Sequence, residues 1–476
     1  MSRRRMDARA AAVDAGRWLR DRLGRADRIL ALGWNEPPPE VAAVTEGRSA
    51  ASPAVARPET FPPGREGEGP FPFIIWRVRS GAVPVADLRQ VRNWLRRDGR
   101  LLVLADTSGD RDASERKWVR SLAESGFVVL RQDGVQIEGT TVLGLMARRD
   151  PYLVRSYRDG DDEAIAALFE SSFRVERRPE HWHWKYHGGP WGGRLVSLAL
   201  TQEGELASHY SGYPVPFWID DGSPTGRNFL GLQMGDTMTH PDHRSAGRGT
   251  ASLLARTVRH FFAIHRRGAL GFYYGFNTGA IRRFCDWFIG GSEAESVRYR
   301  VRTTDASFPD PGEYRVERLD DVTRELDTLF QRAAPAYGFL VRRDAEYLRW
   351  RYVDCPDGGF VVLAARHGDL LVGWSVFRRR DDTVVWGDAL FEPRHVGAAG
   401  AILAAALRQA ELADGAAVEG WFPDRPAFWD HELARLGFEV RPEKNGLTLV
   451  FLPDTEPDIG RQLQRLYYTM GDGDLF

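Results

Sequence analysis

The residues of this chain with the clearest chemical signature form the short segment Arg244–Gly249, which reads Arg-Ser-Ala-Gly-Arg-Gly. Its small residues, above all Gly247 and Gly249, let backbone N–H groups converge on one point. An amphipathic helix predicted over Thr250–His265 would aim its positive end at the same point. The two arginines add positive charge. The spacing therefore predicts a binding site for a pyrophosphate, held between a strand and a helix.

Three side chains near this segment have the chemistry to move protons. Asp236 lies on the strand predicted over Phe229–Thr239, where a carboxylate with a raised pKa could act as a general base. Packing of the strand or positioning of a substrate is the alternative role for Asp236. Tyr273 and Tyr274 are adjacent on the next predicted strand, so their side chains point to opposite faces of the sheet. We expect one of them in the core and the other facing a cleft.

The stretch from Gly235 to Gly290 resembles the GCN5-related N-acetyltransferase superfamily, and residues 151–455 resemble its tandem bacterial members, in which two such domains are fused. In that family a central strand splays from its neighbour, and the pantetheine arm of acyl-CoA pairs with it like an extra strand. The resemblance implies acetyl-CoA, or another acyl-CoA, as the cofactor. It also implies that the coenzyme is held by Thr237, Met238, Thr239, Arg244, Ser245, Ala246, Gly247, Arg248, Gly249, Thr250 and Asn277.

One departure from the family concerns the proton donor. Many members carry a tyrosine seven residues after the pantetheine asparagine, where it protonates the leaving thiolate, but this chain has Phe284 after Asn277. A phenyl ring has no proton to give, so the resemblance leaves the acid open. We expect Asp236, Tyr273 and Tyr274 to supply the catalytic groups, with water as an alternative proton donor.

The histidine-rich segment His181–His187 raises the question of a metal. A His-x-His pair can ligate zinc, and alternation along a strand would put His181 and His183 on one face. No acidic or cysteine cluster accompanies them in the sequence. We therefore expect no metal site and favour an aromatic wall near an acceptor pocket, or ordinary core packing. His240, which precedes a proline, is expected to cap its turn.

Alternating strands and helices predict an α/β protein of about three domains. Residues 1–150 resemble a trimmed Rossmann-type methyltransferase domain with a mostly parallel sheet, on the basis of 97–104, 124–129 and 146–149. A helix over Ala8–Leu23 should precede its first strand. Where that family has a glycine-rich cofactor loop, this chain reads Leu-Gly-Trp-Asn-Glu-Pro-Pro-Pro, and prolines offer no N–H donors. No S-adenosylmethionine site is expected there.

The rest of the chain repeats itself loosely, with related segments in the same order, such as Pro179–Tyr186 and Asp344–Tyr352. The loop of the second copy, Arg394–Ala399, lacks the second arginine and the final glycine. The coenzyme site is therefore assigned to the first copy, while the second copy is expected to support it. Duplication predicts two mixed-sheet α/β domains and a tail: 151–305, 312–455 and 456–476.

The composition limits the classes of function. A net charge of −1 and 28% charged residues indicate a globular chain and argue against a dedicated nucleic-acid binder. No run of about 18 apolar residues occurs, and two cysteines cannot form a disulfide framework, so we expect a cytoplasmic protein that spans no membrane. The simplest function is transfer of an acyl group to a primary amine of a small molecule, with the acceptor and the oligomeric state open. A coenzyme-binding scaffold and an aminoacyl-tRNA-dependent transferase are the alternatives.

Overall fold

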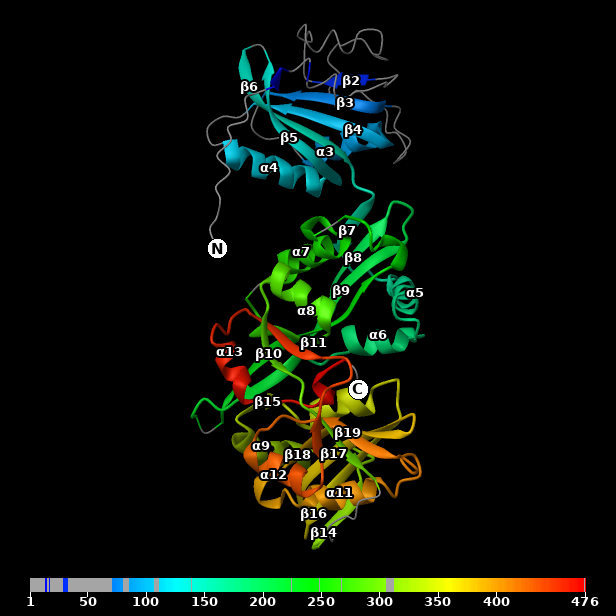
Figure 1. Cartoon of the computed structure of the whole chain (residues 1–476), viewed down its shortest axis with the longest axis vertical. Coiled ribbons are helices and arrows are strands. Elements are labelled where there is room, and N and C mark those ends of the chain that lie inside the picture. Colours follow the sequence, from blue (N-terminus) through cyan, green and yellow to red (C-terminus); the bar gives the residue numbers. More distant parts are fainter. Residues whose placement is uncertain are drawn as a thin grey trace. The chain divides into compact units, whose positions relative to one another are not determined.

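The computed structural model describes residues 13–14, 17, 29–32 and 71–476, apart from 80–84, 107–110, 138, 224, 248, 267, 305–311 and 475. The chain falls into two compact units, Met1–Leu153 and Val154–Phe476 (Figure 1). Each unit has a hydrophobic core of its own. In the described part of the chain, no helix has the length and apolar character that a membrane span requires.

The N-terminal unit is built on a six-stranded sheet in the order β1-β5-β6-β4-β3-β2. Strands β2, β3 and β4 are parallel, whereas β6 runs antiparallel to both β4 and β5. Helices α3 (Val85–Trp94) and α4 (Arg111–Glu124) follow β3 and β4. The strands are β1 (Val13–Asp14), β2 (Ile29–Leu32), β3 (Phe71–Val78), β4 (Leu95–Ala105), β5 (Phe127–Ile137) and β6 (Thr140–Arg149).

The predicted alternation of strands and helices in this unit is confirmed. Leu88 and Val91 of α3 and Trp118 and Leu122 of α4 are buried at helical spacing against the sheet core. The described sheet is mixed: the pairings β1–β5, β2–β3 and β3–β4 are parallel, whereas β6 runs antiparallel to β4 and β5.

Two sequence expectations concern the N-terminal residues. The helix predicted over Ala8–Leu23 lies mostly outside the described residues; of its described residues, Val13 and Asp14 form strand β1, whereas Arg17 is helical. This strand pairs with β5, so partners distant in the sequence override the local amphipathic pattern. The proline-rich segment that follows Leu32 lies outside the described residues.

The first sheet of the C-terminal unit has nine strands in the order β12-β21-β11-β10-β9-β15-β22, with β8 paired to β9 and β7 paired to β8. Helix α7 packs against β8 and β9. The strands that precede the coenzyme segment are β7 (Tyr152–Ser156), β8 (Leu195–Thr201), β9 (Leu206–Ile219) and β10 (Arg227–Thr239). After it come β11 (Phe272–Asn277), β12 (Ser292–Ser296), β15 (Phe339–Val341), β21 (Thr448–Pro453) and β22 (Leu466–Tyr467). The helices around this sheet are α5 (Asp162–Phe173), α6 (Pro179–Tyr186), η2 (Pro241–His243), η3 (Gly249–Ala251), α7 (Leu253–His265), α8 (Gly279–Phe284) and the π-helix η4 (Cys285–Ile289).

The second sheet has seven strands in the order β14-β16-β17-β18-β19-β13-β20. Its strands are β13 (Tyr299–Thr303), β14 (Tyr314–Arg318), β16 (Phe360–His367), β17 (Leu370–Arg380), β18 (Thr383–Phe391), β19 (Ala417–Trp421) and β20 (Glu439–Arg441). Its helices are α9 (Glu325–Tyr337), α10 (Ala345–Leu348), η5 (Arg349–Val353), η6 (Pro393–His395), α11 (Ala398–Ala406) and α12 (Ala427–Arg435). The chain ends with α13 (Ile459–Gln462), η7 (Leu463–Arg465) and η8 (Met470–Asp472).

The two sheets share one succession of elements. In the first, β10 pairs in parallel with β11 and antiparallel with β9; in the second, β18 pairs in parallel with β19 and antiparallel with β17. A short helical turn and a longer helix lie between the two parallel strands in both cases. This correspondence is what a duplication of one α/β repeat would produce.

The two repeats exchange strands. Strand β13 lies in the first repeat by sequence but pairs with β19 and β20 of the second sheet. Strand β21 lies in the second repeat by sequence but is inserted between β11 and β12 of the first sheet, with Tyr273 opposite Leu452. In Figure 1 the red C-terminal segment accordingly lies beside the green strands. Separating the repeats would break these ladders, so the C-terminal unit holds together as one body.

Candidate functional site

A splayed pair of strands organises the candidate site. Strands β10 and β11 are paired only over Gly231–Gln233 and Phe272–Tyr274. Beyond these residues β10 keeps its partner β9, and β11 keeps its partner β21. The ladder of β10 is irregular between Gly235 and Met238, which marks a β-bulge. The edges of β10 and β11 that face each other past this point are therefore free to pair with a ligand.

A pocket opens where these strands part. Thr237 of β10 and Asn277 of β11 lie in its wall, together with residues of α8, η4 and β21. Phe284 also lies in the wall and stacks on Phe288, with ring centroids 5.0 Å apart. The Nδ2 atom of Asn277 donates a hydrogen bond to the Sγ atom of Cys285 over 3.4 Å. The lining is mostly apolar, with a few polar groups, as small-molecule sites usually are.

The loop predicted to bind pyrophosphate is a tight turn next to this pocket. Gly247 has a φ of +79°, and a Cβ atom there would lie 2.2 Å from the carbonyl oxygen of Ala251, so glycine is required. Gly249 lies beside the exposed ring of Trp287, which belongs to η4 in the pocket wall. Among the residues that the structure describes, no acceptor faces the backbone N–H groups of Ser245 and Gly247. These donors are available to an anion.

Other residues of the loop make hydrogen bonds within the protein. The N–H group of Ala246 donates to His243, and the carbonyl group of Thr250 accepts a hydrogen bond from Arg259. Arg244 donates through Nε to the carbonyl oxygen of Thr239 over 3.1 Å, so its guanidinium group braces the end of β10. Arg248 lies outside the described residues.

Helix α7 begins later than predicted. It starts at Leu253, after the separate turn η3, because the Ser252 side chain accepts a hydrogen bond from Ala255 and caps the helix there. The capping role predicted for His240 is confirmed, since its ring accepts a hydrogen bond from the N–H group of Asp242.

The structure separates the two adjacent tyrosines as predicted. Tyr273 packs against Phe262 of α7 on one face of the sheet, while Tyr274 packs against Phe217 on the other. Burial raises the pKa of Tyr273 to about 12, and its hydroxyl group has no hydrogen-bond partner in the described part of the chain. The hydroxyl group of Tyr274 donates to the backbone carbonyl of Asp472 over 3.4 Å. Both side chains are buried and both line the pocket, so the expectation that one would lie in the core and only the other would face the cleft is wrong.

Asp236 lies at the bulge of β10 with a φ of +49° and is surrounded by cations. Its carboxylate contacts Nη1 of Arg177 at 2.8 Å and Nζ of Lys185 at 3.3 Å, and it accepts a hydrogen bond from the hydroxyl group of Tyr186. Burial acts to raise the pKa of Asp236, but Lys185 and Arg177 outweigh it and hold the pKa well below its ordinary value. The expected raised pKa is therefore wrong. The two cations come from a distant helix and from the segment before it, which local spacing does not reveal.

A second carboxylate completes this cluster. Asp474 of the C-terminal tail contacts Nζ of Lys185 at 2.6 Å and accepts a hydrogen bond from the hydroxyl group of Tyr213 over 3.3 Å. A Cβ atom on Gly235 would lie 2.2 Å from the carboxylate of Asp474, so the tail reaches β10 directly at its bulge. The tail thus lies against the first repeat close to the point where β10 and β11 part.

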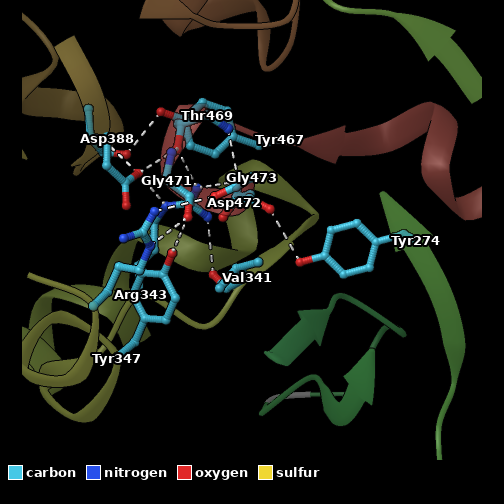
Figure 2. Close-up of polar contacts among 12 residues, drawn as sticks. Tyr274, Val341, Arg343, Tyr347, Asp388, Tyr467, Thr469, Gly471, Asp472 and Gly473 are labelled. Atoms are coloured by element: carbon cyan, nitrogen blue, oxygen red, sulfur yellow. Dashed lines mark hydrogen bonds and ion pairs between the residues drawn. The ribbon is translucent and has the colours of Figure 1, made fainter. Parts of the chain in front are cut away.

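The tail is anchored in the second repeat by a buried guanidinium group. Arg343 is fully buried and pairs with Asp388 at 2.8 Å and with Asp472 at 2.6 Å. Thr469 donates to Asp388, and its own N–H group donates to Asp472. Figure 2 shows Arg343 and Asp388 on one side of the tail and Tyr274 on the other. The tail therefore connects the second repeat to strand β11 of the first.

Asp472 is the acidic residue that sequence reasoning missed. Burial raises its pKa to about 6, against the lowering effect of Arg343. Its Oδ1 atom is buried, with no hydrogen-bond partner within the described ranges. It lines a small internal space together with Tyr213, Tyr274 and Trp350. The pattern Gly-Asp-Gly-Asp in the tail was a visible signal, but nothing local indicated that Asp472 would lie beside Tyr274 of β11.

The corresponding region of the second repeat is filled by side chains. Trp386, Phe422 and Trp429 are buried and pack on one another, with ring centroids 5.3 to 5.6 Å apart. Helix α11 is almost entirely buried as well. The second repeat thus offers a rigid support rather than an open cleft at this point.

No protein-family model and no curated protein matches the chain. Several solved structures are distantly similar to it. A GCN5-related N-acetyltransferase from Anabaena variabilis is 13% identical, with 63% of this chain and 72% of that chain covered and a TM-score of 0.47. A tandem GNAT protein from the clavulanic acid biosynthesis pathway is 14% identical, with 64% and 98% covered and a TM-score of 0.42. N-myristoyltransferase of Saccharomyces cerevisiae, solved with bound myristoyl-CoA and inhibitors, is 10% identical, with 64% and 80% covered and a TM-score of 0.44. At such distances the function has to be argued from the cleft itself.

Proposed function

We propose that this chain is an N-acyltransferase that moves an acetyl or other acyl group from acyl-CoA to a primary amine of a small molecule. The observation that carries the proposal is the splay of β10 from β11 beside a turn with free N–H groups. An extended pantetheine arm can pair with the free edge of β10 like an added strand. The N–H groups of Ser245 and Gly247 can then hold the pyrophosphate.

In the proposed reaction the amine attacks the carbonyl carbon of the thioester in a ternary complex. The C–N bond forms, the C–S bond breaks, and the coenzyme leaves as a thiolate. Positioning of the two substrates supplies much of the rate. The backbone N–H group of Thr237, which lies in the pocket wall and has no ladder partner on β9, is our candidate donor to the oxyanion that develops on the carbonyl.

Two proton transfers complete this scheme. We assign acceptance of the amine proton to Asp472, whose backbone carbonyl accepts a hydrogen bond from the pocket-lining Tyr274 and whose Oδ1 atom has no hydrogen-bond partner within the described ranges. Its pKa of about 6 suits a general base near neutrality. Asp236, ionised and paired with Arg177 and Lys185, would position the elements around the cleft. Tyr273, whose hydroxyl group has no partner in the described ranges, is our candidate for the donor that returns a proton to sulfur.

Calorimetry with acetyl-CoA tests the binding part of the proposal. We expect Gly247→Asp to weaken binding at least about tenfold, because the new side chain meets the backbone of Ala251 and adds negative charge beside the pyrophosphate. The matched control is Gly437→Asp, since Gly437 has a similar φ of +81° and no atom within 4 Å of its Cβ position. Undiminished binding by Gly247→Asp would rule out the loop assignment.

Thiol release from acetyl-CoA across a panel of amines tests the chemistry. The wild-type chain should release thiol with at least one amine, and Asp472→Asn should slow turnover about 100-fold. A chain that binds acetyl-CoA but stays silent with every amine would instead support the coenzyme-binding scaffold. Retention on immobilised tRNA at physiological salt, without acetyl-CoA binding, would support the aminoacyl-tRNA-dependent alternative.

We also propose that the N-terminal unit is a degenerate Rossmann-like domain that serves as a scaffold. Three adjacent parallel strands, β2, β3 and β4, followed by the antiparallel β6, support this proposal. Calorimetry with S-adenosylmethionine should give no binding. A Kd below about 1 mM would contradict this proposal.

A further inference from the structure

Three metal-ligating side chains meet at a seam between the two repeats. His181 belongs to α6 of the first repeat, whereas Cys355 and Asp357 follow η5 in the second. The Nδ1 or Nε2 atom of His181, the Sγ atom of Cys355 and a carboxylate oxygen of Asp357 all lie within 4.8 Å of one another. This cluster could not be predicted from the sequence, because its members are far apart along the chain. In addition, His181 lies on helix α6, whereas a strand was considered for the histidines in the sequence analysis.

The histidine and the cysteine of this cluster are both buried. His181 is 9% exposed and Cys355 is 6% exposed. The Nδ1 atom of His181 lies 2.9 Å from Oδ1 of Asp357 and pairs with that carboxylate. A cation bound between the two atoms would replace this contact, and the Sγ atom of Cys355 lies within 4.8 Å of both residues' ligand atoms.

The loop that carries Cys355 and Asp357 is held in place. Nη2 of Arg178, the residue before α6, donates to the carbonyl oxygen of Pro356 over 2.7 Å. The N–H group of Gly358 donates to the carbonyl oxygen of Cys355 over 3.2 Å and closes a turn around the cluster. A site whose ligands are positioned by such supporting contacts loses little entropy when it binds an ion.

We propose that His181, Cys355 and Asp357 bind a divalent cation of the Zn²⁺ class, with water as the fourth ligand. Nitrogen, sulfur and carboxylate ligands suit Zn²⁺, whereas Ca²⁺ and Mg²⁺ prefer sets made only of oxygen. Zn²⁺ bonds of about 2.0 to 2.3 Å place tetrahedral ligand atoms roughly 3.3 to 3.6 Å apart. The Nδ1 atom of His181 lies 2.9 Å from Oδ1 of Asp357, and all the ligand atoms lie within 4.8 Å of one another. Shifts of the ligand atoms by about 1 Å would therefore complete the site.

The ion would clamp helix α6 to the second repeat. The same helix carries Lys185 and Tyr186, which contact Asp236 at the bulge of β10. A metal at His181 would thereby hold one wall of the cleft in position. The metal site does not depend on acyl transfer, so a failure of either proposal leaves the other to be judged separately.

The test uses the full-length chain, stripped of metal with a chelator and then given Zn²⁺ or Co²⁺. Elemental analysis after desalting should give about one Zn²⁺ per chain, and Co²⁺ should give a thiolate-to-metal charge-transfer band in the near ultraviolet. Cys355→Ser should abolish the band, and His181→Ala should lower the metal content. Cys285→Ser and His183→Ala are the matched controls and should keep both signals.

A second measurement leaves all three proposed metal ligands unchanged. In the Cys285→Ser chain only Cys355 can react with a thiol reagent, and bound Zn²⁺ should slow that reaction at least about tenfold. An unchanged rate with Zn²⁺ would overturn the proposal. So would less than about 0.1 metal ion per chain, or a charge-transfer band that survives in Cys355→Ser.

Discussion

The buried charge cluster at the bulge of β10 makes a quantitative prediction for Asp236→Asn. The substitution keeps the shape of the side chain but removes one of two negative charges that balance two cations. Lys185 keeps its contact with Asp474 at 2.6 Å. Arg177 loses its directly bonded carboxylate and keeps its position over the ring of Phe169, 3.8 Å from the centroid, and its weaker attraction to Asp474. One uncompensated positive charge is left in the cluster.

The expected loss in the free energy of unfolding is about 3 kcal/mol. Breaking a buried ion pair by removing one partner typically costs about 3 to 5 kcal/mol. The lower end applies because the Arg177 side chain is 20% exposed and can recover part of its hydration. The double variant Asp236→Asn/Arg177→Met removes the stranded charge as well, so it should be less destabilised than the sum of the two single variants.

The pH dependence of this loss follows from the direction of the pKa shift. Since the pKa of Asp236 is lower in the folded state, its stabilisation is complete above the unfolded pKa of about 3.9 and is lost only as pH falls toward the folded value. The difference between wild type and Asp236→Asn should therefore be constant from about pH 5 to pH 8 and shrink below about pH 4.

Urea unfolding, followed by intrinsic fluorescence, measures this difference, and amide hydrogen exchange of α6 and β10 provides a local readout. A loss below about 1 kcal/mol at pH 7 would mean that the cluster is solvated and would refute the reasoning. A difference that changes between pH 6 and pH 8 would mean that the pKa of Asp236 is raised rather than lowered.

The remaining predictions concern the tail and the cleft. Arg343→Met should destabilise the C-terminal unit by about 3 to 5 kcal/mol and speed hydrogen exchange in residues 466–474, because Asp388 and Asp472 lose their shared cation. The raised pKa of Asp472 means that the folded state binds its proton more tightly, so this group lowers stability as pH rises from about 4 to about 6; Asp472→Asn should remove that slope in urea titrations. Tyr273→Phe should lower kcat about 100-fold with little change in KM, whereas Tyr274→Phe should lower it less than about tenfold, and equal effects in steady-state kinetics would argue against Tyr273 as the acid.

Much of the local structure was predictable from the sequence. Strand β10 and the turn that follows it were visible in the alternation of side chains and in the two glycines, and Gly247 indeed has a φ that other residues rarely adopt. The capping role of His240 and the opposite faces of Tyr273 and Tyr274 followed from the same short-range geometry. Such features depend on backbone dihedral angles and on burial within one element, which a few neighbouring residues determine.

Features that depend on distant segments were not predictable in this way. The pKa direction of Asp236, the contact of Asp472 with Tyr274, the exchange of β13 and β21, and the meeting of His181 with Cys355 all join residues at least 51 positions apart. The sequence alone determined which residues could form a strand, a turn or a helix and which carried charge. Only the tertiary structure decided which charges became neighbours and how far they lay from water, because electrostatic energies depend on distance and solvation rather than on position along the chain.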